Sequence, residues 1–517
     1  MIVVGLSAAA SLLVGAAVPA PAALPCVPVP TVLDRCPSWV ASYHHPEGHN
    51  GVGQQESRAI IASPAGDRVY ITGAIYDDEA ASDFGTIAYD ASTGATIWLE
   101  RHDGPSHQGD GATAIALSPA ADVVYVTGVE TIARGTETVG DFATVAYDAA
   151  TGTRRWVARF AGPAGGDDRA RGVAVSPDGR RVYVAGISDS AGGDRDTALL
   201  AYDAATGEEV WAIRFAGPSG HDDTLTRIAI APDGSQIYLA GEQDSDPSQD
   251  PPALSRYAVS AYAAKDGEEL WRAAYDGGLP GRNIAKGIVA DEVSVFVTGE
   301  SYGPDGGYDF ATASFAATDG ELRWSRRYSG DAAASDDARA IALNPAGDRL
   351  FVAGRATVVE EELPQGIRQT GSDFAVLAYD PASGSLLWES GYGLPQQRWE
   401  LPTAMTTSPD GSRVYVTGMG AREYAPENVN NQCANCPSAF ITVAFDASNG
   451  ARAWAGRFRP TAEELDAGVP SGIAAAGGRV FVTGTFGGFT YACTVALTCA
   501  GQDLENFSDY WTLAYEG

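Results

Sequence analysis

The residues of this 517-residue sequence best suited to chemistry are carboxylates that recur beside a repeated turn. The turn reads Ser-Pro-x-Gly in its clearest copies, and the position nine residues before its proline is polar in most copies. Six of these polar residues form a candidate binding ring, which the fold predicted below would place at the mouth of its central channel: Asp110, Asp168, Asp223, Asn283, Asp336 and Glu400. Oxygen ligands of this type suit Ca²⁺. The alternative is that each side chain ties down its own loop through hydrogen bonds to nearby backbone.

A second candidate site is formed by histidines. Five of the six lie on two consecutive loops that the repeat places on the same face: His44, His45, His49, His102 and His107. Imidazole nitrogens gathered in this way could bind Zn²⁺ or Cu²⁺. The alternative is a set of exposed loop histidines that bind no metal.

The six cysteines fall into three pairs that are close in sequence: Cys26 with Cys36, Cys433 with Cys436, and Cys493 with Cys499. This spacing favours local disulfides that staple loops, and other connectivities stay open. A redox-active Cys-x-x-Cys pair at Cys433 and Cys436 is the alternative for the second pair.

The N-terminal residues predict export. Residues 1–23 are apolar and small and end near Ala20-Pro21-Ala22, as a cleavable signal peptide does. An uncleaved membrane anchor is the alternative. Residues 24–36 then form a linker, and the paired cysteines agree with an oxidising compartment. We therefore expect a secreted or cell-surface protein.

The elements that must position these residues follow from an internal repeat. The pattern A-x-D-x-x-T-G-x-x-x-W recurs at a spacing of roughly 55 to 65 residues. Each unit reads as four short strands, and the fourth carries a tryptophan. The tryptophans at this position are Trp39, Trp98, Trp156, Trp211, Trp271, Trp324, Trp388 and Trp454. We expect each ring to dock against the adjacent unit, which would bury a large apolar area.

Repeated four-stranded units predict an all-β fold, an eight-bladed β-propeller over residues 37–517. The last unit ends before its tryptophan strand, whereas the strand around Trp39 precedes the first Ser-Pro-x-Gly turn. We therefore expect this N-terminal strand to complete the last blade and to close the ring.

The repeat resembles two known families. The A-x-D-x-x-T-G-x-x-x-W element, intact at 146–156 and 201–211, resembles the tryptophan-docking motif of eight-bladed quinoprotein (PQQ) dehydrogenases. The longer unit at 141–163 is similar to the secreted bacterial β-propeller repeat (SBBP-like, PQQ-like repeat) family. The first resemblance implies PQQ held under a disulfide between adjacent cysteines. No two cysteines are adjacent here, so PQQ is not expected. The second implies fold and export.

Composition and motifs together favour a binding function. The formal net charge of −32 would repel a phosphate backbone, so nucleic acid is not an expected partner. No Ser-His-Asp order, paired-carboxylate spacing or phosphate loop stands out. We expect a monomeric module that binds a protein, peptide or carbohydrate on its long-loop face, the face formed by the second-to-third and fourth-to-first strand loops. A PQQ-dependent dehydrogenase-like or other propeller enzyme is the alternative.

Overall fold

The computed structural model describes residues 34–43, 52–76, 81–135, 137–190, 194–215, 223–244, 255–330, 334–363, 367–393, 397–422, 438–459, 466–489 and 506–517. Every regular element in these ranges is a β-strand, which confirms the all-β class. Among the same residues, no helix is long and apolar enough to cross a membrane. The expected signal peptide at residues 1–23 lies outside the described residues.

Most strands belong to sheets of four consecutive antiparallel strands. Five such sheets contain β4 (Glu56–Ala62), β5 (Arg68–Tyr76), β6 (Ser82–Asp90) and β7 (Thr96–His102); β8 (Gly111–Leu117), β9 (Val123–Arg134), β10 (Glu137–Asp148) and β11 (Arg154–Phe160); β12 (Asp168–Val175), β13 (Arg181–Asp189), β14 (Arg195–Asp203) and β15 (Glu209–Phe215); β16 (Asp223–Ile230), β17 (Gln236–Asp244), β18 (Ser255–Ala263) and β19 (Glu269–Tyr275); and β20 (Asn283–Ala290), β21 (Ser294–Tyr302), β22 (Tyr308–Ala316) and β23 (Leu322–Tyr328).

The remaining strands form two larger sheets. One has nine strands, β24 (Asp337–Leu343), β25 (Leu350–Leu363), β26 (Ile367–Tyr379), β27 (Leu386–Tyr392), β28 (Gln397–Thr407), β29 (Arg413–Arg422), β30 (Ser438–Asp446), β31 (Arg452–Phe458) and β1 (Asp34–Arg35). Its two halves meet through one parallel pair between Ser372 and Trp399. The other has five strands, β32 (Asp466–Ala476), β33 (Arg479–Phe489), β34 (Asn506–Glu516), β2 (Trp39–Tyr43) and β3 (Val52–Gln54).

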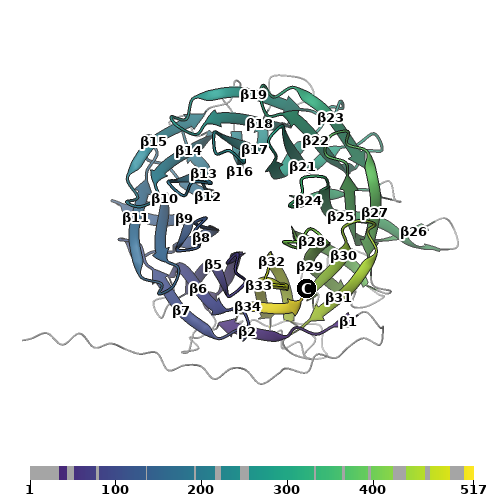
Figure 1. Cartoon of the computed structure of the whole chain (residues 1–517), viewed down its shortest axis with the longest axis horizontal. Helices are drawn as coiled ribbons and strands as arrows, with labels where there is room; N and C mark the ends of the chain where they lie inside the picture. Colours follow the sequence, from purple (N-terminus) through teal and green to yellow (C-terminus); the bar gives the residue numbers. More distant parts are fainter. Residues whose placement is uncertain are drawn as a thin grey trace, which may run out of the picture.

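The sheets are arranged around a common centre, as Figure 1 shows. The first strand of each four-stranded unit, such as β8, β12 or β16, lies nearest the centre, and the fourth, such as β11, β15 or β19, lies at the outside. This is the architecture of a β-propeller.

The hydrophobic core lies between neighbouring sheets. One cluster brings Tyr238 of β17 and Val259 of β18 against Val297 of β21 and Phe315 of β22. Because neighbouring sheets cover both faces, the second strands bury successive residues, as β13 does from Val182 to Ala185.

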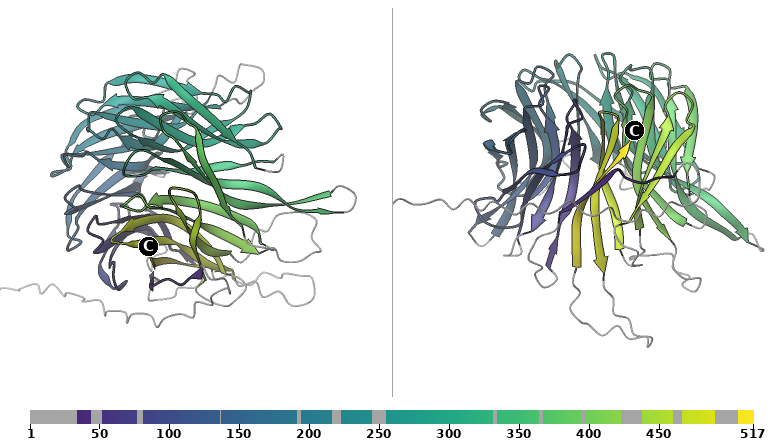
Figure 2. Two further views of the ribbon diagram at one scale, coloured as in Figure 1. Left: turned by 45° about the vertical axis from the view of Figure 1, so that its right-hand side comes forward. Right: turned by 60° about the horizontal axis from the view of Figure 1, so that its bottom comes forward.

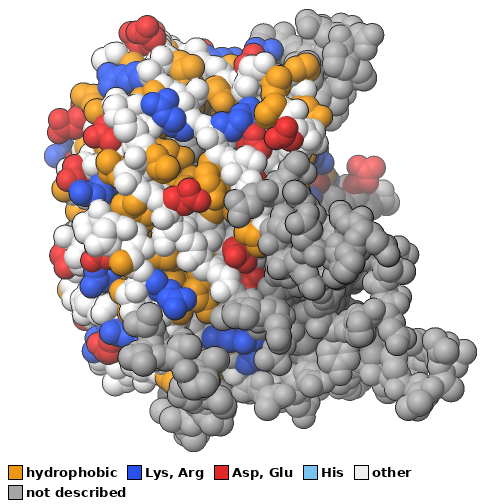
Figure 3. All heavy atoms as spheres, turned by 90° about the vertical axis from the view of Figure 1, so that its right-hand side faces the viewer, with side chains coloured by type: hydrophobic (Ala, Val, Ile, Leu, Met, Phe, Trp, Pro, Cys, Tyr) orange, Lys and Arg blue, Asp and Glu red, His pale blue; other side chains and the backbone are white. Residues whose placement is uncertain are grey.

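The fourth strands keep some apolar side chains exposed. Figure 3 shows hydrophobic side chains interspersed with charged ones on the wall at the side of β23 and β27.

The N-terminal strands lie beside C-terminal ones (Figures 1 and 2). Strand β2 pairs antiparallel with β34, from Trp39 opposite Ala514 to Tyr43 opposite Tyr510. Strand β1 pairs parallel with β31. The expected linker at 24–36 therefore ends in a strand at Asp34 and Arg35, because the outer edge of β31 offers unpaired backbone groups to an extended chain.

One hairpin extends well beyond the others. Strands β25 and β26 have 14 and 13 residues, against nine each in β13 and β14. Their pairing continues to Leu363 opposite Ile367, and the hairpin projects from the ring in both views of Figure 2.

Candidate functional site

The turns between third and fourth strands, which define the turn face, use their polar groups internally. Asp148 Oδ1 accepts hydrogen bonds from the backbone N–H groups of Ala150 and Thr151, at 3.1 and 3.0 Å. The next residue, Gly152, has φ of 76°, a conformation that a glycine adopts without strain. The hydrogen bond from Arg155, together with those of the turn, holds the pKa of Asp148 below its ordinary value. The turn face is therefore built from structural groups.

The tryptophans join each unit to the next. The indole Nε1 of Trp98 donates to the carbonyl oxygen of Ala149 at 3.1 Å, and the ring lies against Gly152. Seven tryptophans donate to the equivalent carbonyl at 2.8–3.3 Å: Trp39, Trp98, Trp156, Trp211, Trp271, Trp324 and Trp388. The buried Nε1 of Trp454 has no hydrogen-bond partner among the described residues, and the guanidinium of Arg35 lies 5.4 Å from its ring centre.

The six residues of the candidate binding ring are buried where the first strands begin. Each is at most 2% exposed: Asp110, Asp168, Asp223, Asn283, Asp336 and Glu400. Asp336 accepts the backbone N–H of Gly330 at 2.6 Å and that of Thr357 at 2.5 Å. Asp110 makes the equivalent two bonds at 2.6 and 2.7 Å, and burial raises its pKa to about 6. These bonds tie the loop before a first strand to the end of the second strand. A role of the ring in cation binding stays a prediction.

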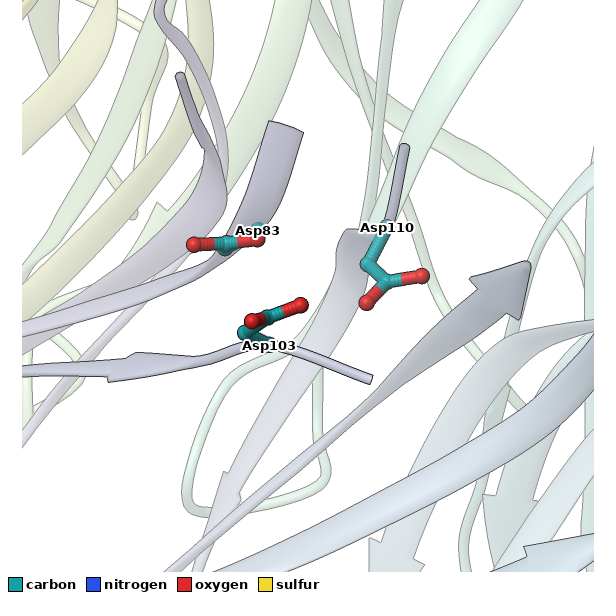
Figure 4. Close-up of side chains that lie close together, drawn as sticks. All are labelled: Asp83, Asp103 and Asp110. Carbon is teal, nitrogen blue, oxygen red and sulfur yellow. The ribbon is translucent and has the colours of Figure 1, made fainter. Parts of the chain in front are cut away.

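Three carboxylates of the first two units face one another, as Figure 4 shows. Potential ligand oxygens of Asp83, Asp103 and Asp110 all lie within 4.8 Å of one another. Arg101 pairs with Asp83 at 2.5 Å, and His107 Nδ1 lies 2.5 Å from Asp103. Protein groups, a guanidinium and an imidazole, therefore already accompany two of the three carboxylates.

The two described histidines lie in different environments. His102 is buried, with Nε2 at 2.5 Å from Glu130 and Nδ1 at 3.4 Å from Arg154. Burial alone would raise the pKa of Glu130, but hydrogen bonds from His102 and Arg159 hold it below its ordinary value. Both ring nitrogens of His102 are thus engaged by protein groups. His107 has an exposed side chain.

The rest of the histidine cluster, His44, His45 and His49, lies outside the described residues, so a metal site on these loops stays a prediction. Among the cysteines, Cys36 is disulfide-bonded. The other five, Cys26, Cys433, Cys436, Cys493 and Cys499, also lie outside the described residues, and the connectivity stays a prediction.

A column of residues at the centre of the ring was missed by the sequence reasoning. Each first strand contains a β-bulge, a residue that is skipped in the pairing with the second strand. The bulged residue stands three positions after the residue that is aligned with the candidate ring. The bulged residues are Arg58, Thr113, Arg171, Thr226, Lys286, Arg339, Thr403 and Ser471.

A cavity shows that this column reaches the common centre. Its volume is about 400 Å³, and Thr226, Lys286, Arg339 and Thr403 line it from four different first strands. The alignment that gave the candidate ring contains this column, six residues before the proline. This column differs from its neighbours in the alignment through the β-bulge, which cannot be recognised in the sequence.

The sequence profile of the family described as "Outer membrane protein assembly factor BamB" matches residues 140–245 and 255–421, more than half of the chain. No curated protein matches the chain in sequence.

Solved structures with a similar fold come from several functional classes. Sqt1 of Chaetomium thermophilum, solved with the N-terminus of ribosomal protein L10, is 12% identical with a TM-score of 0.52 and covers 91% of this chain and 98% of its own. Quinohemoprotein alcohol dehydrogenase ADHIIG of Pseudomonas putida HK5 is 16% identical, with a TM-score of 0.46 and coverage of 90% and 76%. BamB of Moraxella catarrhalis is 14% identical, with a TM-score of 0.43 and coverage of 89% and 98%. Of these three, the likeness to Sqt1 supports the fold and nothing further, because the identity is 12%.

Proposed function

Because the chain belongs to the family described as outer membrane protein assembly factor BamB, we propose that it is an exported β-propeller that binds another protein through its long-loop face. The partner segment is basic, and the chain acts as a binding module rather than as an enzyme. The family name supports an extracytoplasmic location.

The observation that carries this proposal is the long hairpin of β25 and β26. Beyond Thr357 and Ser372, where the equivalent hairpin of β13 and β14 ends, the ladder continues from Val358 to Leu363 and from Ile367 to Gly371. No third strand pairs with this extension among the described residues. A two-stranded ribbon is marginally stable by itself in water. Its open edges are suited to pairing with an extended partner segment.

The charge of the hairpin indicates the kind of partner. Its sequence contains three consecutive glutamates at positions 360–362, in a chain of net charge −32. An acidic docking element attracts a basic surface and speeds the encounter with it. The chain also shows that strand edges of this propeller accept an extended segment, since β1 pairs in parallel with the outer edge of β31.

The alternative function, a quinoprotein dehydrogenase, needs a PQQ site. The quinoproteins that the repeat resembles hold PQQ under a disulfide between adjacent cysteines, whereas the six cysteines of this chain include no adjacent pair. The residues present therefore do not fit that site, and we derive no reaction step from it.

We further propose that the ring has eight blades and that β2 supplies the fourth strand of the last one. Five sheets account for five blades, the nine-stranded sheet for two, and β32, β33, β34 and β2 for the eighth. The indole of Trp39 in β2 donates to Ala91 at 2.9 Å, as six of the other fourth-strand tryptophans do toward the unit that follows theirs.

Cross-linking of the full chain in the extracytoplasmic fraction of the producing cell, read by mass spectrometry, tests the binding proposal. We expect a specific protein adduct near β25 and β26. It should be lost when residues 358–371 are replaced by an Asn-Gly turn, and weakened when the glutamates at 360–362 become glutamine.

The matched control places the same charge change on the turn face, with Glu208, Glu268 and Glu321, all exposed, changed to glutamine. This variant should keep the adduct. Loss of the adduct in the control alone would refute the assignment of the face. Oxidation of alcohols with an electron-accepting dye, after addition of PQQ and Ca²⁺, would refute the non-enzymatic function.

A further inference from the structure

The bulged column at the centre of the ring has a composition unlike that of the chain. Arg58, Arg171, Lys286 and Arg339 are basic, and the other four members are threonine or serine. No member is acidic, although the chain has 66 acidic residues and 34 lysines and arginines. The hydroxyls of Thr113, Thr403 and Ser471 donate to backbone carbonyl oxygens of the fold, so the basic members supply the charge that favours an anion.

On one side of the centre, the basic groups are only partly neutralised. Lys286 Nζ lies 2.7 Å from Glu300 and 3.1 Å from Asp337. Asp337 also pairs with Arg339 at 2.6 Å and with Arg355 at 2.9 Å. Two carboxylates thus face three cations, which leaves an excess of positive charge beside the cavity.

On the other side, two guanidinium groups stand without counter-ions. The guanidinium groups of Arg171 of β12 and Arg227 of β16 have no hydrogen bond or ion pair among the described residues. Both are exposed to solvent, yet surrounding protein desolvates them and lowers the pKa of each. The charges of Arg58, Arg169 and Arg227 lower the pKa of Arg171 further by repulsion. Arg58 and Arg169 pair with the carboxylates of Glu56 and Asp167. Arg171 and Arg227 therefore remain the two cations of this group whose charge a bound anion would offset.

The cavity connects these groups. Besides Lys286, Arg339 and two threonines, Arg227 and one carboxylate, Glu242, line its wall. Glu242 is paired with Arg282 at 2.7 Å, so the positive charges of Arg227, Lys286 and Arg339 still exceed the negative ones around the cavity. Its volume of about 400 Å³ falls within the range of small-molecule sites. The backbone of Thr226, which precedes Arg227, lies against Gly172, so the strand of Arg171 borders the same region.

We propose that the centre of the ring binds a small oxyanion with two or more negative charges, phosphate or a phosphate monoester, through Arg227, Lys286 and Arg339 with Arg171 beside them. A guanidinium group binds two oxygens of such an anion with parallel hydrogen bonds. The hydroxyl of Thr226 adds a neutral donor, whereas that of Thr403 already donates to the carbonyl oxygen of Thr417 at 3.3 Å. The net charge of −32 keeps polyanions from the surface, whereas a small anion can enter the centre. This site is separate from the proposed partner surface.

Isothermal titration of the full chain with inorganic phosphate tests the proposal, with citrate as a second oxyanion and chloride as the reference. Arg227→Gln and Arg171→Gln should each weaken phosphate binding by about tenfold, and the double variant should weaken it further. Arg227→Lys keeps the positive charge but loses the paired N–H groups of the guanidinium. Its affinity for phosphate should therefore lie between those of the wild type and Arg227→Gln. Phosphate should also raise the thermal midpoint of the wild type.

The matched control is Arg180→Gln on the turn face, where the side chain is 82% exposed. It makes the same charge change and should leave the affinity unaltered. Because the glutamine variants remove repelling charges, they should unfold no earlier than the wild type, which separates lost binding from lost folding. Binding of citrate without phosphate would support the site and assign a carboxylate ligand. Absence of saturable binding of both oxyanions, chloride binding of equal strength, or equal affinity of the double variant and the control would overturn the proposal.

Discussion

The docking tryptophans allow a comparison between two sites that differ mainly in one hydrogen bond. Trp271 is 7% exposed and donates to the carbonyl oxygen of Ala317 at 2.8 Å. Trp454 is 3% exposed, but its Nε1 has no partner among the described residues. We predict that Trp271→Phe lowers the free energy of unfolding by clearly more than Trp454→Phe does.

The size of the difference follows from the hydrogen bond. Both substitutions remove the same ring atoms from almost fully buried positions. The loss of apolar burial is therefore similar, and it largely cancels when the two variants are compared with each other. Trp271→Phe also leaves the buried oxygen of Ala317 without this donor, at a cost of about 1–3 kcal/mol. Trp454→Phe instead removes a buried N–H for which the described part of the chain offers no acceptor, and so relieves a desolvation cost of the same order. We therefore expect a difference of at least about 1 kcal/mol.

Urea unfolding followed by far-ultraviolet circular dichroism measures this difference, with the free energy obtained by linear extrapolation. The dependence on urea should be the same in both variants, so that the midpoints compare stability alone. Equal destabilisation within about 0.3 kcal/mol, or a larger loss for Trp454→Phe, would refute the view that the indole hydrogen bond contributes to blade docking.

Two further predictions concern the turns and the closure of the ring. Gly320 and Gly278 have φ of 74° and 73°, but a Cβ at Gly320 would lie 2.5 Å from the ring of Trp271, whereas no atom lies within 4 Å at Gly278. Gly320→Ala should therefore cost about 1–3 kcal/mol more than Gly278→Ala in the same urea assay, and equal costs would argue against the close packing. Deletion of residues 1–43 removes β2 and the buried ring of Trp39 and should cost at least about 2 kcal/mol relative to deletion of residues 1–23; equal thermal midpoints of the two truncations would contradict closure by β2.

The strands were predictable because their pattern repeats. Most units repeat the tryptophan, the glycine and the turn carboxylate, so a weak signal in one copy, as where Ala263 or Ala316 replaces the carboxylate, is supported by the others. The pairing of β1 with β31 was not predictable, since Asp34 and Arg35 carry no strand pattern. The length of the β25–β26 hairpin was equally hidden, because glutamates at 360–362 are depleted in strands in general.

The candidate ring illustrates how spacing can find residues without finding their role. A period fixes where Asp110 and Asp336 lie but says nothing of burial, and both side chains accept backbone hydrogen bonds within their own unit. A carboxylate that accepts hydrogen bonds from a particular backbone conformation is expected in every unit that repeats this conformation. Their repetition is therefore better explained by local structure than by a shared ligand.

In the central column of bulged residues, the backbone conformation repeats from unit to unit but the side chain does not. The bulge recurs in every first strand, so the backbone position is structural, yet its side chains vary between arginine, lysine, threonine and serine. A role in holding the unit together would favour one residue type, as it does for the docking tryptophan. Thr113, Thr403 and Ser471 use this position for hydrogen bonds to backbone carbonyls. The four basic members, and the absence of acids at this position of an acidic chain, are better explained by what the centre binds. The oxyanion titration tests this explanation directly, because a change of Arg171 or Arg227 removes no side-chain hydrogen bond among the residues that the structure describes.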